Sequence, residues 1–282
     1  MTAERIYRFR DGKELTIGGR TLVMGILNVT PDSFSDGGQW NTRDNALRHM
    51  EEMVQDGADI IDVGAESSRP GFVPMGAAEE TERLLPLLEA VLQECPVPVS
   101  VDTFKAETAR AALAAGADML NDIWGLQYVE EPGEMARVAA EADAPVVVMH
   151  NQNGTAYDGD IVGEMRAFFE RSFALADAAG LARDKIILDP GIGFGKTAEQ
   201  NMHVIRRMDE LISYDGTDYP VLLGASRKSF IGAALGLPVE ERMEATGAAC
   251  VLGIVRGASI VRVHDVKPIA RMCRMTDAIL GA

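Results

Sequence analysis

Cysteine, histidine and long apolar runs are scarce in this chain of 282 residues. Its three cysteines, Cys95, Cys250 and Cys273, are far apart, which argues against a disulfide framework and against a cysteine-type zinc site. The four histidines form no HxH or HExxH pattern, so a zinc hydrolase is disfavoured. The sequence has no signal-peptide core and no apolar run near the roughly 20 residues that a membrane helix needs. We expect a cytoplasmic protein without membrane contact.

Positive charge is also in short supply. Lysine and arginine total 27 against 43 aspartates and glutamates, which gives a formal net charge of -16. Nucleic acid and anionic lipid are bound chiefly through excess basic residues, so neither is expected as a partner. The simplest explanation of the acidity is a solvated surface that aids solubility. A phosphate-bearing substrate would therefore have to meet a local basic cluster.

The length and composition fit one globular domain over residues 1–282. The hydrophobic content of 47% and charged content of 25% are ordinary for a globular protein. Residues 6–17 alternate apolar and polar side chains around Asp11-Gly12, which predicts a short β-hairpin. The remainder, from about residue 21 to 282, has the length of a (β/α)8 barrel, for which about 250 residues are typical.

Eight short β-branched runs follow the hairpin, with segments of helical period between them. The runs are LVMGILN, DIIDVG, VPVSVD, DMLND, PVVVMH, KIILDP, PVLLGA and SIVRVH, and helical segments include 45–56, 77–94, 106–115 and 164–179. This alternation indicates parallel strands with right-handed crossovers. Polar or glycine residues end nearly every strand, whereas an open sheet would gather them at one switch point. We predict an α/β fold, a (β/α)8 TIM barrel with its site at the C-terminal ends of the strands.

The first two loops after strands carry candidate ligands. Residues 24–38, MGILNVTPDSFSDGG, have the length and polarity of a functional lid. Asn28 is a candidate metal or phosphate ligand, or else a turn cap, and the Asp32 carboxylate could approach a developing cation. The second loop, GAESSRPG, places Ser68 and Arg69 in a proline-stiffened turn, where hydroxyl and guanidinium donors suit a phosphate.

The glycine-rich segment DPGIGFGKT, residues 189–197, resembles a nucleotide-binding loop but has the wrong spacing. Three residues, not four, separate Gly191 from Gly195, and Lys196 stands where a dinucleotide fingerprint needs glycine. The Asp189 carboxylate could accept two hydrogen bonds from a guanidine-like heterocycle. The alternatives are that Asp189 caps a helix or pairs with Lys196.

The last two strands supply the basic cluster that an anionic substrate requires. The segments GASRKSF and IVRVHDV bring Lys228, Arg262 and His264 to the place where barrels commonly bind phosphate. His264 could instead be a core histidine, although Arg262 two positions earlier favours a site. His150 has no such companion, and we expect it to be structural. The Gly-Ala-Asp repeats at residues 57–59 and 116–118 are expected to end helices.

Taken together, these segments resemble the dihydropteroate synthases, the sulfonamide targets of the pterin-binding family. MGILNVTPDSFSDGG, DVGAESSRPG, SVDT, NDI, VVMH, LDPGIGFGK, SRKSFIG and RVHDV occur in the family's order from residue 24 to 266. The resemblance implies a usually dimeric barrel enzyme of folate biosynthesis. Its members condense 6-hydroxymethyl-7,8-dihydropterin diphosphate with 4-aminobenzoate and release diphosphate.

The resemblance also implies roles for the residues that match its motifs. Asn28 would bind Mg2+ on the diphosphate, and Ser68, Arg69, Arg262 and His264 would hold the diphosphate oxygens. Many relatives carry threonine where this chain has Ser68, so the packing of the methyl group is lost there.

A second set of matched residues would surround the heterocycle and the arylamine. Asp102, Asn121 and Asp189, here called the pterin floor, would read the donors and acceptors of the pterin ring, with Met149 packed on it and Lys228 in contact with it. The aminobenzoate would be bordered by Phe194, Pro70 and Ser229.

These roles imply an ionisation-led substitution without a covalent enzyme nucleophile. Asp32, Asp189 and Lys228 are its candidate catalytic residues. One alternative is a methyltransferase that moves a methyl group from methyltetrahydrofolate to a corrinoid, but it should lack the lid and the phosphate residues. The other is a non-catalytic pterin-binding paralogue, which the intact motifs disfavour.

Overall fold

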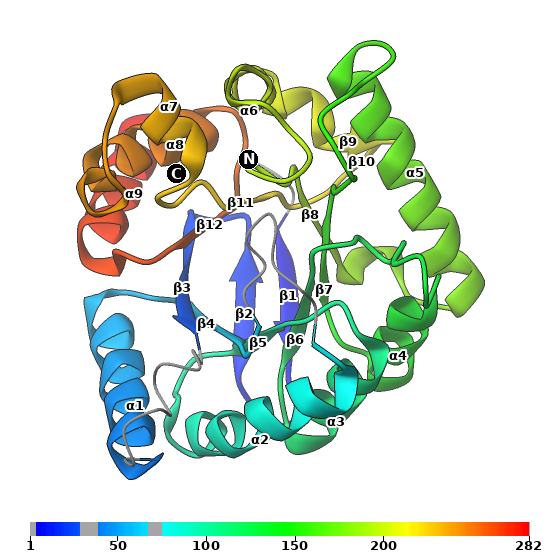
Figure 1. Ribbon diagram of the computed structural model, residues 1–282, viewed down its shortest axis with the longest axis vertical. Helices are drawn as coiled ribbons and strands as arrows, with labels where there is room; N and C mark the ends of the chain where they lie inside the picture. Colours follow the sequence, from blue (N-terminus) through cyan, green and yellow to red (C-terminus); the bar gives the residue numbers. More distant parts are fainter. Residues whose placement is uncertain (1–3, 29–38, 67–74, 282) are drawn as a thin grey trace.

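Eight parallel strands form the central sheet of the computed structural model, which describes residues 4–28, 39–66 and 75–281 (Figure 1). In their order around the sheet, they are β11 (Leu222–Leu223), β12 (Ile260–Val263), β3 (Leu22–Asn28), β4 (Ile60–Gly64), β5 (Val99–Asp102), β6 (Met119–Asp122), β7 (Val146–Met149) and β8 (Ile186–Asp189). A parallel bridge between Leu188 and Val221 joins the last strand to the first. The prediction of eight strands in a TIM barrel is confirmed.

Helices cover the outside of this barrel. Strands such as β4, β7 and β8 are therefore buried on both faces. The helices are α1 (Gln39–Asp56), α2 (Ala77–Glu94), α3 (Ala106–Ala115), α4 (Glu134–Ala142), α5 (Ile161–Ala179), α6 (Ala198–Arg206), α7 (Ser229–Leu235), α8 (Met243–Val255) and α9 (Val266–Leu280). The connections between these elements contain the 3-10 turns η2 (Arg183–Lys185), η3 (Met208–Leu211) and η4 (Val239–Glu241) and a small hairpin of β9 (Ser213–Tyr214) and β10 (Thr217–Asp218). The predicted bounds of α2 and α3 are confirmed, whereas α1 and α5 begin earlier than expected.

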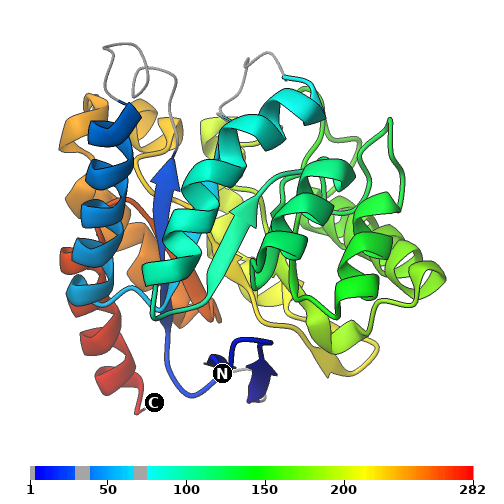
Figure 2. The ribbon, with the colours of Figure 1, turned by 90° about the horizontal axis from the view of Figure 1, so that it is seen from below.

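The predicted N-terminal hairpin is present and closes one end of the barrel. Strand β1 (Arg5–Arg8) pairs antiparallel with β2 (Glu14–Ile17), and Figure 2 shows both beneath the barrel at the end from which β3 rises. Tyr7, Leu15 and Ile17 are buried in one cluster with the first inward-facing residues of the barrel strands. The Tyr7 hydroxyl also donates to the Asp184 carbonyl at 2.7 Å. With this end filled, the opposite end is left for a ligand.

The Gly-Ala-Asp repeats act as structural joints, as expected. Gly57 and Gly116 follow α1 and α3 with φ of +107° and +114°, a conformation that residues with a Cβ rarely adopt. The carboxylates of Asp59 and Asp118 then accept hydrogen bonds from the amides of Val23 and Val99, at 2.9 and 2.8 Å. Each repeat therefore ends a helix and fixes the start of a neighbouring strand.

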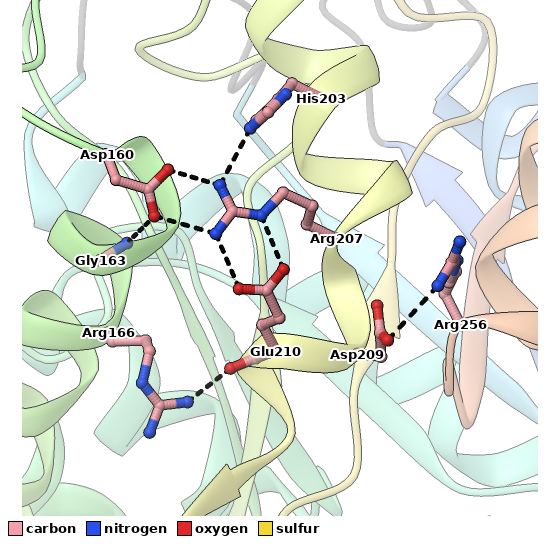
Figure 3. A network of polar contacts seen from close by, with 8 residues as sticks. All are labelled: Asp160, Gly163, Arg166, His203, Arg207, Asp209, Glu210 and Arg256. Atoms are coloured by element: carbon pink, nitrogen blue, oxygen red, sulfur yellow. Dashed lines mark hydrogen bonds and ion pairs between the residues drawn. The ribbon is translucent and has the colours of Figure 1, made fainter.

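An exposed ionic network ties α5 to the segment after α6 on the outer surface (Figure 3). Arg207 pairs with Asp160, the N-cap of α5, and with Glu210, and its guanidinium also contacts the His203 ring at 3.1 Å. We call these four residues the Arg207 network.

A search of the described helices for a long apolar stretch that could cross a membrane finds none.

Candidate active site

A half-buried arginine lies at the centre of a polar cluster that draws on four strands at the C-terminal end of the barrel. Arg262 of β12 donates through Nε to Asp62 Oδ2 of β4 at 2.6 Å and through Nη2 to Asp102 Oδ2 of β5 at 2.8 Å. Asn121 Nδ2 of β6 donates to the same Asp62 oxygen at 3.0 Å. We call these four residues the Arg262 cluster. It arises because the ends of neighbouring parallel strands meet at one rim.

Burial removes the carboxylates of this cluster from water, so they need hydrogen-bond donors within the protein or from a ligand. Asp62 is completely buried, and its Oδ1 has no hydrogen-bond partner among the described residues. Burial raises the pKa of Asp102 to about 7, against the opposing effect of the Arg262 charge. A buried acceptor without a donor carries a desolvation cost of about 1–3 kcal/mol. The cluster therefore offers acceptors to a ligand that brings N–H groups.

Asp189 ends β8 beside this cluster. Its Oδ1 accepts the Gly191 amide at 2.7 Å, so the carboxylate also anchors the start of the glycine-rich loop. Burial raises its pKa to about 6, while the Gly191 amide and the charges of Lys228 and Arg262 oppose the rise. At neutral pH the carboxylate is thus largely ionised and acts as an acceptor. No ion pair joins Asp189 to Lys196 within the described residues, so that alternative is wrong.

An apolar cluster stands next to these polar groups and is separate from the main core. Phe104, Ile123, Met149 and Phe194 are buried in it, with Trp124 and Tyr128 packed against them. The Lys228 ammonium lies 4.1 Å from the centre of the Phe194 ring. The rim therefore combines a polar floor with aromatic walls, an arrangement that suits flat aromatic ligands.

His264 is held as a neutral ring, which sharpens the expectation of a basic cluster. Its Nδ1 lies 2.9 Å from Ser226 Oγ, and Ser226 Oγ also accepts the His264 amide. Burial and the nearby charges of Arg262 and Arg227 lower the pKa of His264 to about 4. At pH 7, His264 can offer an N–H group to an anion but no positive charge, which leaves Arg262 and Lys228 as the cations expected here.

The remaining predicted residues are either exposed or lie outside the described residues. Asn28 is exposed at the end of β3, and Ser229 is exposed as the first residue of α7. Four further candidates, Asp32, Ser68, Arg69 and Pro70, lie outside the described residues. The described residues contain no group of three or more His, Cys, Asp and Glu side chains that could hold a metal ion.

Two charged residues of the site are not among the predicted site residues. Asp62 stands in the run DIIDVG, and only the structure shows its carboxylate against Arg262. Lys196 was noted for its failed motif spacing, yet its ammonium is buried beneath the glycine-rich loop and contacts His150. The useful signal in both cases is a charge within an otherwise apolar or glycine-rich strand end.

Known proteins of one family match this sequence over nearly the whole chain. The profile of the family described as "Pterin binding enzyme" matches residues 24–264. The dihydropteroate synthase of Bacillus subtilis is 52% identical, with 93% of this chain and 90% of that protein aligned.

Solved structures extend the comparison to the fold. A dihydropteroate synthase of Clostridium difficile, solved in the presence of pteroic acid, is 50% identical with a TM-score of 0.88 and covers 93% of this chain and 98% of its own. The Xanthomonas albilineans dihydropteroate synthase with 4-aminobenzoic acid is 38% identical with a TM-score of 0.89 and covers 99% and 100%. This chain belongs to the pterin-binding enzyme family and, within it, to the dihydropteroate synthases.

Proposed function

We propose that this chain joins 4-aminobenzoate to 6-hydroxymethyl-7,8-dihydropterin diphosphate by ionisation-led substitution. The observation that carries the proposal is the buried polar floor of Asp102, Asn121 and Asp189, crossed by Arg262 and walled by Met149 and Phe194. A pterin ring has a flat face and an edge of N–H donors, which match these walls and acceptors. The proteins solved with pteroic acid and 4-aminobenzoic acid support the same pair of substrates.

The proposed reaction begins with loss of diphosphate. The bond between the pterin methylene carbon and the diphosphate oxygen breaks, and its electron pair leaves with the diphosphate. Arg262, His264, Ser68 and Arg69 are proposed to bind the departing oxygens, because charge-assisted hydrogen bonds strengthen as negative charge develops.

The methylene cation is then captured by the second substrate. The ionised carboxylate of Asp189 and that of Asp32 are proposed to stabilise the cation electrostatically, with Lys228 in contact with the pterin. The 4-aminobenzoate nitrogen forms the new C–N bond and loses a proton. Phe194, Pro70 and Ser229 are proposed to border the aminobenzoate ring, and Met149 to pack on the pterin.

Mg2+ is proposed to enter with the diphosphate. Asn28 offers one amide oxygen at the rim, and Mg2+ typically keeps several waters and uses few protein ligands when it is bound to phosphate groups. This donor set fits an ion shared with the substrate better than an ion held by the protein alone. When bound, the metal would neutralise charge on the leaving diphosphate.

The decisive experiment is an assay for diphosphate release by the purified chain with Mg2+. We expect release that requires both the pterin diphosphate and 4-aminobenzoate, with dihydropteroate as the product. Release with water alone would argue against the synthase reaction. Binding of pterin without turnover would indicate the paralogue, and methyl transfer from methyltetrahydrofolate to a corrinoid would indicate the methyltransferase.

We also propose that the chain acts in the cytoplasm as a homodimer through α8 and α9. Leu252 and Val255 of α8 and Met275 and Ile279 of α9 are exposed, and the two helices pack together. Large apolar side chains exposed on two helices that pack together support a partner surface there. Light scattering should give twice the chain mass, and Val255→Glu with Ile279→Glu should give a monomer. The three cysteines, all of them buried thiols, agree with a reducing compartment.

A further inference from the structure

Lys196 is a buried cation for which the proposed reaction has no use. It is 8% exposed and ends the glycine-rich loop at residues 191–195. No described carboxylate lies within ion-pair distance of its ammonium. A buried charge is costly, and burial lowers the pKa of Lys196 to about 7, an effect that the more distant charge of Asp189 opposes only in part. A side chain kept in this position therefore needs a reason beyond packing.

The ammonium has three partners, one for each N–H group. It lies 2.9 Å from Nδ1 of His150 and donates to the carbonyl oxygens of Gly191 and Phe194, each at 3.0 Å. His150 follows β7, whereas the two carbonyls belong to the loop after β8. Lys196 thus fastens the loop to the neighbouring strand end.

The glycines of this loop pack closely against neighbouring groups. Gly191 has φ of +65°, and a Cβ there would clash with the His150 carbonyl oxygen. A Cβ on Gly193 would lie 2.9 Å from Cδ of Lys228. Phe194, which Lys196 holds by its carbonyl, presents its ring to the Lys228 ammonium. The position of the Phe194 ring therefore depends on the Lys196 contacts.

We propose that Lys196, together with His150, is a positioning residue for the arylamine substrate, acting through Phe194. The inference rests on the proposed function, in which Phe194 borders 4-aminobenzoate. Asp189 depends less on Lys196, because pairing of β8 with β7 holds its backbone and because the Lys196 charge has the smallest effect among the groups that act on the Asp189 pKa. The effect should therefore fall on the second substrate more than on the pterin.

The test is steady-state kinetics of Lys196→Met in the full-length enzyme, with each substrate varied in turn. We expect KM for 4-aminobenzoate to rise about tenfold, from loss of about 1.4 kcal/mol. KM for the pterin diphosphate should change by less than about threefold. Lys185→Met is the matched control, because Lys185 lies just before the N-terminal end of β8, away from the site, and pairs with Asp143. Both KM values should stay unchanged in this variant.

A merely structural role would lower the melting temperature or kcat without separating the two KM values, and that result would overturn the proposal. His150→Phe keeps the ring packing and removes one partner, so it should raise KM for 4-aminobenzoate in the same direction but less, even if Lys196→Met fails to fold. An unchanged KM in His150→Phe would also count against the inference. A wild-type enzyme that forms no dihydropteroate would instead refute the proposed function.

Discussion

Two arginines in this molecule make similar contacts in opposite surroundings. Arg262 bridges two carboxylates inside the barrel rim, and Arg207 bridges two carboxylates on the outer surface. The closest distances are also alike, 2.6 Å for Arg262 to Asp62 and 2.5 Å for Arg207 to Asp160. Geometry alone would rank the two clusters equally.

Burial separates them. Asp62 and Asp102 have side chains only 0% and 8% exposed, whereas Asp160 and Glu210 are 51% and 47% exposed. Water screens the surface charges and can replace either partner, so exposed pairs contribute little to stability. In the rim, loss of one partner leaves a desolvated charge behind. The buried cluster is therefore costly to disturb, and its desolvated carboxylates are available to a ligand that brings N–H donors.

The largest effect is expected from Arg262→Met, which leaves two buried carboxylates without their cation. We expect the free energy of unfolding to fall by about 3–5 kcal/mol, measured by urea denaturation. Turnover should fall by at least about 100-fold, because Arg262 is a proposed donor to the leaving group.

A triple variant separates these two consequences. Arg262→Met combined with Asp62→Asn and Asp102→Asn removes the buried charges together, so most of the stability should return while activity stays low. Recovery of activity with stability would show that Arg262 acts only in folding.

The next effect concerns the pH dependence of catalysis. The pKa of Asp189 is raised to about 6 by burial, so the acceptor form is lost as the pH falls through 6. We expect kcat/KM for the pterin diphosphate to fall about tenfold per pH unit below pH 6, since this parameter reports ionisation in the free enzyme. Asp189→Asn should lower kcat/KM at pH 8 by about 100-fold and flatten this acid limb. An acid limb unchanged in Asp189→Asn would assign it to another group.

The same raised pKa values have the opposite sign for stability. Asp189 and Asp102 ionise more readily in the unfolded chain, so their contribution is present at low pH and is lost as the pH rises through about 6 and about 7. Ionisation therefore destabilises the free enzyme in the pH range where it provides the acceptors proposed to bind the pterin.

Strand ends explain why much of the site could be predicted from the sequence. Once the eight runs are placed in a parallel barrel, Asp102, Asn121 and Asp189 must converge, because every strand points to the same rim. The hairpin follows from the local signal of Asp11-Gly12. Both results depend only on sequence pattern and strand direction.

Contacts between distant side chains were not predictable in this way. The Asp62–Arg262 pair joins residues on two strands that both neighbour β3 but do not pair with each other, and no pattern along the chain specifies it. The neutral state of His264 likewise depends on burial beside Arg227 and Arg262. The β9–β10 hairpin was missed because its strands have only two residues each.

A smaller effect is expected from Arg207→Met in the Arg207 network. Water can solvate Asp160 and Glu210 after the change, so the melting temperature should fall by no more than about 3 °C. Catalysis should be unchanged, because the network is exposed and shares no residue with the predicted site (Figure 3). Calorimetry and the diphosphate assay check the two expectations. A loss of stability as large as that of Arg262→Met would break the distinction between the two clusters.

The smallest expected effect is the response of these variants to salt. Raising NaCl from 0.05 to 1 M shortens the screening length to about 3 Å, which suppresses interactions between exposed charges far more than those between buried ones. The melting temperatures of Arg207→Met and the wild type should therefore converge, whereas the deficit of Arg262→Met should persist. Equal sensitivity of both variants to salt would mean that water reaches Asp62 and Asp102 as readily as it reaches Asp160. The Arg262 cluster would then not be desolvated. Its disruption would carry no large cost, and its carboxylates would not be held ready for a ligand.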